Sequence, residues 1–128
     1  MRLLLDTHTL LWWLEDNPGL SDGARRAIGD YKNEVFLSVA SVWEMAVKIS
    51  LGRLTLSRPL PKLVGPELTA SGITLLPVRA EHCFAVCKLS FHHRDPFDRM
   101  LVSQAIAESL RLVSKNAIFD SYPVTRLW

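Results

Sequence analysis

The sequence predicts an α/β protein: a three-layer α/β/α domain over residues 1–128, with a central, mostly parallel sheet of about five strands. Three observations lead to this fold class. Short apolar runs without polar alternation, such as Leu3 to Leu5, are typical of strands buried on both faces. Segments with apolar residues at helical spacing separate these runs. Because strands and helices alternate, right-handed crossovers should give one parallel sheet covered on both faces.

The chain begins with the strand–helix unit around which the predicted site is organised. The apolar run Leu3 to Leu5 stops abruptly at Asp6, and apolar residues then recur at helical spacing up to Leu14. Thr7 and Thr9 are candidate N-caps of this helix. In open parallel sheets, ligands bind beyond the carboxyl ends of the strands, which is where Asp6 is expected.

The rest of the chain continues the alternation without repeats or linkers, so one domain is expected. The predicted elements are a helix from Ser21-Asp22 to about Tyr31, a strand at 34–37, a helix from Val39 to near Gly52, a poorer helical stretch from Pro59 to Gly72, a strand at 73–78, a helix at 80–89, a loop at 91–94, a helix from Pro96 to about Leu110, a strand at 111–114 and a last strand at 124–128.

Composition places the chain among globular proteins. With 48% hydrophobic and 22% charged residues, its 128 residues suffice for a buried core. A formal net charge of +2 excludes a histone-like basic protein, so contacts with nucleic acid should be local. The first apolar run is too short for a signal peptide and no stretch approaches a membrane span, so we expect a cytoplasmic protein. Cys83 and Cys87 should then be reduced thiols.

Three carboxylates are expected to meet at the carboxyl edge of the sheet. Asp6 ends the first strand, Glu44 lies on the second turn of the helix after the second strand, and Asp98 lies in the first turn of the helix that begins at Pro96. Clustered carboxylates repel one another and raise at least one pKa unless a cation intervenes. A hard ion such as Mg²⁺ or Mn²⁺ suits these oxygens, activates water and stabilises a phosphodiester transition state.

Each acid also has a purely structural interpretation. Asp6 can cap the first helix. Glu44 completes a Ser-x-x-Glu capping box, although Ser38 is the better-placed cap and leaves Glu44 in mid-helix. Asp95, directly before a proline, is typical of an N-cap, and Asp98 complements the helix dipole. The residue types alone leave both interpretations open.

Three motifs resemble the PIN-domain ribonucleases, and most closely the VapC toxins of bacterial toxin–antitoxin pairs. They are Leu4-Leu5-Asp6-Thr7-His8, Ser38-Val39-Ala40-Ser41-Val42-Trp43-Glu44 and His93-Arg94-Asp95-Pro96-Phe97-Asp98-Arg99-Met100-Leu101. The resemblance continues through Phe119 to Val124 and so covers the whole chain. It implies a compact PIN-like α/β/α domain with the activity of a metal-dependent endoribonuclease.

Within this resemblance, Asp6, Glu44 and Asp98 match the family's catalytic acids, which would hold one or two Mg²⁺ or Mn²⁺ ions. Thr7 would lie beside the metal. The implied substrate is RNA, either tRNA or rRNA. The implied partners are a small antitoxin, whose C-terminal segment crosses the acidic site with an Arg or Lys, and a second copy of the chain in a homodimer.

One segment departs from the family's pattern. The family commonly has a fourth acid after the fourth strand, in a Thr-x-Asp pattern, whereas this chain has Ser114-Lys115-Asn116. Asn116 still offers a carbonyl oxygen to a metal, but it carries no charge, so a second metal position should be weakened. Asp120 replaces the missing acid if its segment folds back, and is otherwise a surface residue.

Other side chains are candidates for supporting roles. Contacts with the substrate, or positions behind the metal ligands, are expected for His8, Ser114 and Arg99. A phosphate-contacting rim would use Lys48, Arg53, Arg94, Arg99 and Lys115. Core or partner-binding positions, rather than RNA stacking, are expected for Trp12, Trp13 and Trp43. The cysteines lack the usual zinc spacing and are expected to be small buried hydrophobes.

Two other functions compete with a metal-dependent nuclease. Asn116 motivates a catalytically weak or inactive PIN-like binding module that pairs with an antitoxin-like partner. A phosphotransferase with Asp6 as its nucleophile is disfavoured, because that pattern needs a second Asp two residues later, where this chain has His8.

Overall fold

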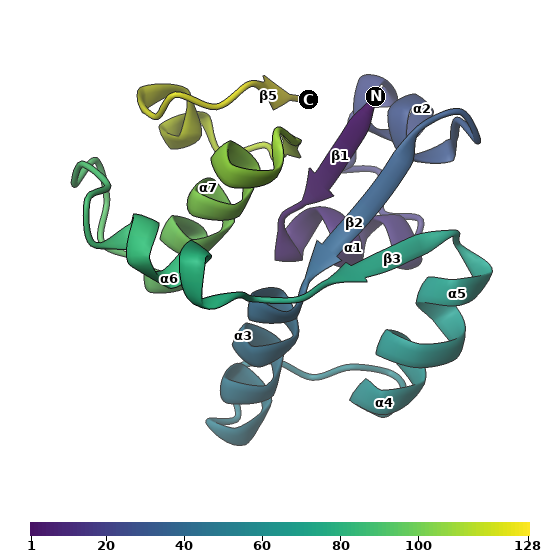
Figure 1. The fold of residues 1–128 in the computed structure, drawn as a ribbon. Helices are drawn as coiled ribbons and strands as arrows, with labels where there is room; N and C mark the ends of the chain where they lie inside the picture. Colours follow the sequence, from purple (N-terminus) through teal and green to yellow (C-terminus); the bar gives the residue numbers. More distant parts are fainter.

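Five strands form one sheet with the order β3-β2-β1-β4-β5 in the computed structural model, which describes residues 1–128 (Figure 1). The strands are β1 (Arg2–Leu5), β2 (Glu34–Ser38), β3 (Ile73–Leu76), β4 (Arg111–Val113) and β5 (Arg126–Leu127). Every neighbouring pair is parallel. β1 lies at the centre, and Leu3 to Leu5 are completely buried, as expected for an apolar run with no polar alternation.

Helices connect the strands and cover both faces of the sheet, which confirms the predicted α/β/α class (Figure 1). They are α1 (Thr7–Leu14), α2 (Asp22–Gly29), α3 (Val39–Ser50), α4 (Leu60–Lys62), the π-helical turn η1 (Leu63–Glu67), α5 (Leu68–Ala70), α6 (Ala80–Val86), α7 (Pro96–Glu108) and the 3₁₀ turn η2 (Ala117–Ser121). No helix combines the length and hydropathy of a bilayer-spanning segment.

Two apolar clusters fill the space between the sheet and the helical layers. Leu3 and Leu5 of β1 pack on one face with Leu10 of α1 and with residues of α2. Leu4 points to the other face, where it packs with Leu101 and its neighbours on α7. Successive side chains of a strand point to opposite faces, so three consecutive leucines anchor both layers at once.

Three strands end at the same edge of the sheet and place the site there. Leu5 pairs with Leu37 of β2 and with Val113 of β4. The residues that follow these positions therefore emerge side by side, and α1 and α3 begin directly after β1 and β2. Asp6, the first residue beyond β1, lies at this edge, as predicted.

Several element boundaries differ from the predictions. Of the three candidate caps of α1, it is Asp6 and not Thr7 or Thr9 that caps the helix, because its side chain accepts from the Thr9 amide. β3 ends at Leu76, directly before Pro77, which has no amide to donate to a neighbouring strand. β5 is restricted to Arg126–Leu127. The turn η2 was not predicted, since its five residues are too few to show helical periodicity; Asn116 caps it by accepting from the Ile118 amide.

Candidate active site

A cavity of about 140 Å³ at the carboxyl edge of the sheet is lined by four carboxylates. Asp6 follows β1, Glu44 lies on the second turn of α3, and Asp95 and Asp98 stand at the start of α7. The remaining wall consists of Thr7, His8, Lys48, Asn116 and Phe119. The structure thus brings together the three acids singled out from the sequence and adds Asp95 to them.

Asp6 divides its two oxygens between the fold and the cavity. Its Oδ1 accepts a hydrogen bond from the Thr9 amide at 2.7 Å and so caps α1. Its amide donates to the Val113 carbonyl at 3.2 Å, which fixes the residue against β4. No protein donor bonds to Oδ2. The helix-capping role and a role in the cavity are therefore compatible in one side chain.

Glu44 is only 5% exposed, and protein donors hold both of its oxygens. Thr7 Oγ1 donates to Oε1 at 2.6 Å, and Lys48 Nζ donates to Oε2 at 2.7 Å. These bonds offset the cost of burying an acid on an otherwise apolar helix. The hydrogen bond to Glu44 raises the pKa of Lys48, and the charges of Glu44, Asp95 and Asp98 add to it against desolvation. Lys48 is therefore a fixed positive charge beside the acids.

Asp98 carries the clearest sign of crowded negative charge. Burial raises its pKa to about 6, and the charge of Asp95 adds to this effect. The hydrogen bond from His93, with Nε2 3.3 Å from Oδ2, acts in the opposite direction, while the charge of Glu44 raises the pKa further. A strongly shifted carboxylate in a cavity marks a candidate functional site, and a cation would relieve the shift.

A buried network centred on Tyr122 lies behind Asp98. The Tyr122 hydroxyl accepts hydrogen bonds from the amides of His92 and His93, both at 3.2 Å. Arg99 Nη1 lies 3.4 Å from the same oxygen, and His93 Nδ1 lies 3.0 Å from it. The network therefore fixes the ring of His93, whose other nitrogen faces Asp98.

Comparison with known proteins identifies the family of the chain. The family model for the PIN domain matches residues 3–124. The chain belongs to the PIN-domain family. Ribonuclease VapC22 of Mycobacterium tuberculosis (strain ATCC 25618 / H37Rv) is 31% identical over 130 residues, and the match covers 96% of each protein. The resemblance to PIN-domain and VapC proteins that the motifs indicated is confirmed.

Solved structures share the fold of this PIN domain. VapBC2 from Rickettsia felis, bound to a DNA fragment from its promoter, has a TM-score of 0.72 at 18% identity, over 98% of this chain and 97% of that one. FitAcB from Neisseria gonorrhoeae has a TM-score of 0.67 at 17% identity, over 98% and 96% of the two chains. A toxin–antitoxin complex from Klebsiella pneumoniae has a TM-score of 0.55 at 13% identity, over 94% and 92%. At these identities the likeness concerns the fold alone.

The three predicted site residues in the segment after β4 of this PIN domain have different positions relative to the acidic cavity. Asn116 lines the cavity, while its Oδ1 caps η2 by accepting from the Ile118 amide at 3.2 Å. Ser114 is buried outside the cavity wall, and its Oγ accepts from the Asn116 amide at 3.0 Å, so it supports Asn116. Asp120 does not replace the missing acid, because it lies outside the cavity and forms two bonds of 2.9 Å with Arg126.

Arg99 is the clearest correction among the predicted site residues. It is 4% exposed and lines no part of the acidic cavity. Its guanidinium donates to the carbonyls of Leu89 and Ser90 at 3.0 and 2.9 Å and lies over the ring of Phe91 at 3.9 Å. It is therefore a structural residue that fixes the segment between α6 and α7, and it is not available to a substrate phosphate. Of the other predicted rim residues, only Lys48 lines this cavity.

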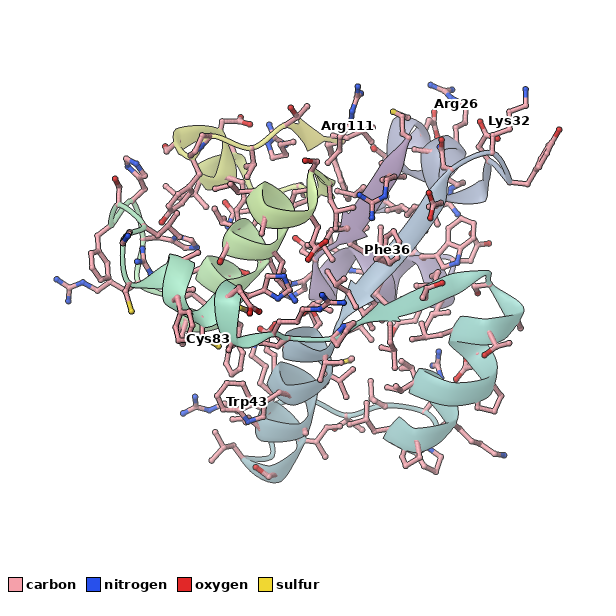
Figure 2. The ribbon with its side chains drawn as sticks, in the orientation of Figure 1. Arg26, Lys32, Phe36, Trp43, Cys83 and Arg111 are labelled. Atoms are coloured by element: carbon pink, nitrogen blue, oxygen red, sulfur yellow. The ribbon has the colours of Figure 1, made fainter.

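Exposure decides one open alternative and overturns one expectation. Trp43 is 62% exposed and packs edge-on against Phe97 with ring centroids 5.1 Å apart, so of the two positions expected for it, core or partner-binding, the core is excluded. Cys83 and Cys87 are exposed and not small buried hydrophobes. Figure 2 shows Trp43 on α3 and Cys83 on α6 at the surface, where both line an apolar groove of about 450 Å³. Trp12 and Trp13 do pack, partly buried, against the core.

Two side chains of the site carried sequence signals that were not used. Asp95 caps α7, with its Oδ1 accepting from the Phe97 amide at 2.9 Å, and it also lines the cavity. Residues three apart share a helix face, so Asp95 and Asp98 were bound to lie close. Lys48 follows Glu44 by four residues, which is the spacing of a helical ion pair. The contact of His93 with Asp98 had no such signal.

Proposed function

We propose that this PIN-domain protein is a metal-dependent endoribonuclease that cleaves RNA phosphodiester bonds as the toxin of a toxin–antitoxin pair. The observation that carries the proposal is the cavity lined by Asp6, Glu44, Asp95 and Asp98, in which burial and neighbouring charge raise the pKa of Asp98 to about 6. The 31% identity to a ribonuclease of the VapC type supports the reaction class.

The donor set of the cavity fits Mg²⁺ or Mn²⁺. All four acids supply hard oxygen ligands, and their excess negative charge is not neutralised by Lys48 alone. No group of three or more His, Cys, Asp or Glu side chains is already arranged to hold an ion directly. Protein donors hold both oxygens of Glu44 and one oxygen each of Asp6 and Asp98, so these side chains must exchange hydrogen bonds or use their remaining oxygens when an ion binds. We propose Asp6 and Asp98 as the principal ligands, with Glu44 completing the site and Asn116 contributing weakly.

The side chains around the acids have distinct tasks in this proposal. A bound divalent ion lowers the pKa of its water and stabilises charge on the phosphate. Thr7 orients Glu44 through its 2.6 Å hydrogen bond. His93 orients Asp98. His8, exposed at the rim of the cavity, is placed to contact the RNA that enters it.

The partners follow from the same proposal. The substrate is a cellular RNA, with tRNA and rRNA as the classes to test first, which implies action in the cytoplasm. A cognate antitoxin would silence the site by presenting a cationic side chain to the acids, as Lys48 already does from within. Complexes of toxins with antitoxins among the structural neighbours support such a partner.

We also propose that two copies of the chain pair through the apolar groove that contains Trp43 and Phe97. Exposed apolar side chains of this kind mark interaction surfaces. Trp43→Glu should convert a dimer into a monomer in analytical ultracentrifugation. Tyr31→Glu, at an even more exposed aromatic residue outside the groove, is the control.

The central experiment incubates purified protein with total tRNA and rRNA in Mn²⁺, Mg²⁺ or EDTA. Cleavage should require a divalent ion, and Asp6→Asn and Asp98→Asn should abolish it while the circular dichroism spectrum stays unchanged. Asp120→Asn, which removes an acid outside the cavity, should cleave at the wild-type rate. Full activity of either cavity variant would remove the proposed site.

The second candidate function is a catalytically weak or inactive binding module that keeps the fold and the antitoxin partner. Asn116 in place of a fourth acid favours it, as does the engagement of both Glu44 oxygens by the protein. Calorimetric titration separates the two candidates. Heat of binding at millimolar Mn²⁺ supports the nuclease, and its absence supports the binding module.

A further inference from the structure

A second cavity, of about 230 Å³, lies directly beside the acidic one. The two cavities share Asp6, His8 and Asn116 as a common wall. The rest of its lining consists of Thr9, Trp12, Lys115 and Trp128. The proposed chemistry makes no use of the last three residues, so their gathering beside the acids needs another explanation.

Aromatic rings and one positive charge dominate this second cavity. The indole rings of Trp12 and Trp128 have centroids 6.0 Å apart at an interplanar angle of 54°. The ring of His8 lies edge-on to Trp12 at 6.4 Å. Lys115 is exposed, with Nζ 5.7 Å from the centroid of the Trp12 ring. Indole faces accept any base by stacking, and a flexible ammonium is a common contact for a phosphate.

We propose that the cavity lined by Trp12, Lys115 and Trp128 is a nucleotide subsite, in which the base adjacent to the cleaved bond stacks on an indole ring while Lys115 binds a backbone phosphate. This inference rests on the proposed function, because it takes RNA as the substrate. Because the two cavities share Asp6, His8 and Asn116, a strand bound at the acids reaches this space by continuing past that wall.

Size and charge favour a nucleotide over a peptide side chain. Ligand pockets for whole small molecules measure about 300–1,000 Å³, so 230 Å³ suits a single ring system. The four carboxylates of the adjacent acidic cavity repel an RNA backbone. Lys115, in the wall of the second cavity, supplies a compensating attraction for the phosphates. The same lysine repels the cationic side chain by which an antitoxin would enter the acidic cavity.

The test measures the affinity of a fluorescein-labelled, mixed-sequence RNA decamer for Asp98→Asn protein by fluorescence anisotropy. In this background, Trp12→Leu and Trp128→Leu should each weaken binding about 5- to 150-fold, the range expected for loss of one stacked base. Trp13→Leu is the matched control, because Trp12 and Trp13 pack on the same core cluster and only Trp12 lines the cavity. Its affinity should stay within twofold of the parent protein.

Lys115→Met provides an independent measurement. Losing one phosphate contact on a single strand should reduce the slope of log affinity against log salt by about 0.7. Lys32→Met, just before the amino end of β2 and therefore at the opposite edge of the sheet, should leave the slope unchanged.

Three results would each overturn the subsite. The parent Asp98→Asn protein binds no RNA, both Trp12→Leu and Trp128→Leu keep the parent's RNA affinity, or Trp13→Leu loses as much RNA affinity as they do. Unchanged RNA affinity with weakened antitoxin binding would assign the cavity to the antitoxin instead. Failure of the proposed function gives a different result: the wild-type protein then binds the decamer through these residues but cleaves no RNA in Mn²⁺.

Discussion

Lys48 Nζ lies 2.7 Å from Glu44 Oε2, so the acidic cavity contains a cation that the chain itself supplies. Thr7 holds the other oxygen of Glu44. A divalent ion that uses Glu44 must therefore compete with an ammonium tethered one helical turn away. This pairing explains how a buried acid is tolerated on α3, and it makes Lys48 a determinant of cation affinity in the proposed site.

Lys48→Met should lower the stability of the metal-free protein and enlarge its response to Mn²⁺. Glu44 then loses its charged partner, which costs about 1–3 kcal/mol for a buried carboxylate. Its free oxygen becomes available to the ion, so the increase in Tm on adding Mn²⁺ should exceed that of the wild type. Thermal unfolding in EDTA and in Mn²⁺ measures both effects, with Lys32→Met as the control. An equal Mn²⁺ shift in variant and wild type would mean that Lys48 does not compete.

The pKa of Asp98, about 6 against an ordinary 3.8, predicts a pH dependence of stability in EDTA. The folded protein holds this proton more tightly than the unfolded chain, so the free energy of unfolding should fall as pH rises from about 4 to about 6 and then level off. Asp98→Asn should lack this fall and be more stable than wild type at pH 7, by at most about 3 kcal/mol.

Urea unfolding of wild type and Asp98→Asn at pH 4.5 and pH 7 measures this difference. Groups far from the cavity titrate equally in both proteins, so the contrast between them reports Asp98 together with the charged groups that face it. A variant no more stable than wild type at pH 7 in EDTA would contradict the prediction.

The sequence predicted those parts of the molecule that depend on local patterns. The run Leu3 to Leu5 is typical of a strand at the centre of a parallel sheet, and its pairing with β2 and β4 places Asp6 at the carboxyl edge. The cap at Ser38 was equally local, and its Oγ accepts from the Ala40 amide at 3.0 Å, which leaves Glu44 in mid-helix.

The parts that were missed or misplaced depend on contacts between distant segments. Arg99 sits within a site motif, and only the packing of α6 against α7 directs it to the carbonyls of Leu89 and Ser90. Trp43 has apolar neighbours in the sequence, yet it lies at the surface beside Phe97 of α7, with 62% of the residue exposed. No local pattern predicts that the hydroxyl of Tyr122 accepts a hydrogen bond from the amide of His92, thirty residues earlier in the chain.

His93 is predicted to position Asp98 through a fixed ring tautomer. The Tyr122 hydroxyl is surrounded by donors, namely the amides of His92 and His93 and the guanidinium of Arg99, so its own proton must go to His93 Nδ1. Because Nδ1 accepts that proton, Nε2 carries the single N–H of the neutral ring and donates to Asp98 Oδ2 at 3.3 Å. The orientation of one acid in the cavity is thereby linked to a hydroxyl outside it.

A pair of amide substitutions tests this link. His93→Gln places an N–H near the position of Nε2, whereas the side chain of His93→Asn is too short to reach Asp98. His93→Asn should reduce RNA cleavage and Mn²⁺ affinity about 10- to 100-fold, and His93→Gln should recover most of the loss. Cleavage rates and calorimetry measure the two effects, with equal Tm values as the control for folding. Equal losses in both variants would mean that the donor to Asp98 is unimportant.

Asn116→Asp restores a charge at the position where this chain departs from its family's pattern. The side chain already caps η2 through Oδ1, and an aspartate caps equally well, so the local fold should persist. The added charge increases the repulsion at Asp98, and the metal-free variant should therefore be less stable than wild type in EDTA. In Mn²⁺ the order should reverse, because another carboxylate oxygen is available to hold the ion. Asn17→Asp, where Oδ1 accepts from the Gly19 amide in a turn outside the cavity, adds the same charge elsewhere and should show neither effect. If Asn116→Asp binds Mn²⁺ no better than Asn17→Asp does, the segment after β4 takes no part in holding the metal, and the cation site ends at Asp6, Glu44 and Asp98.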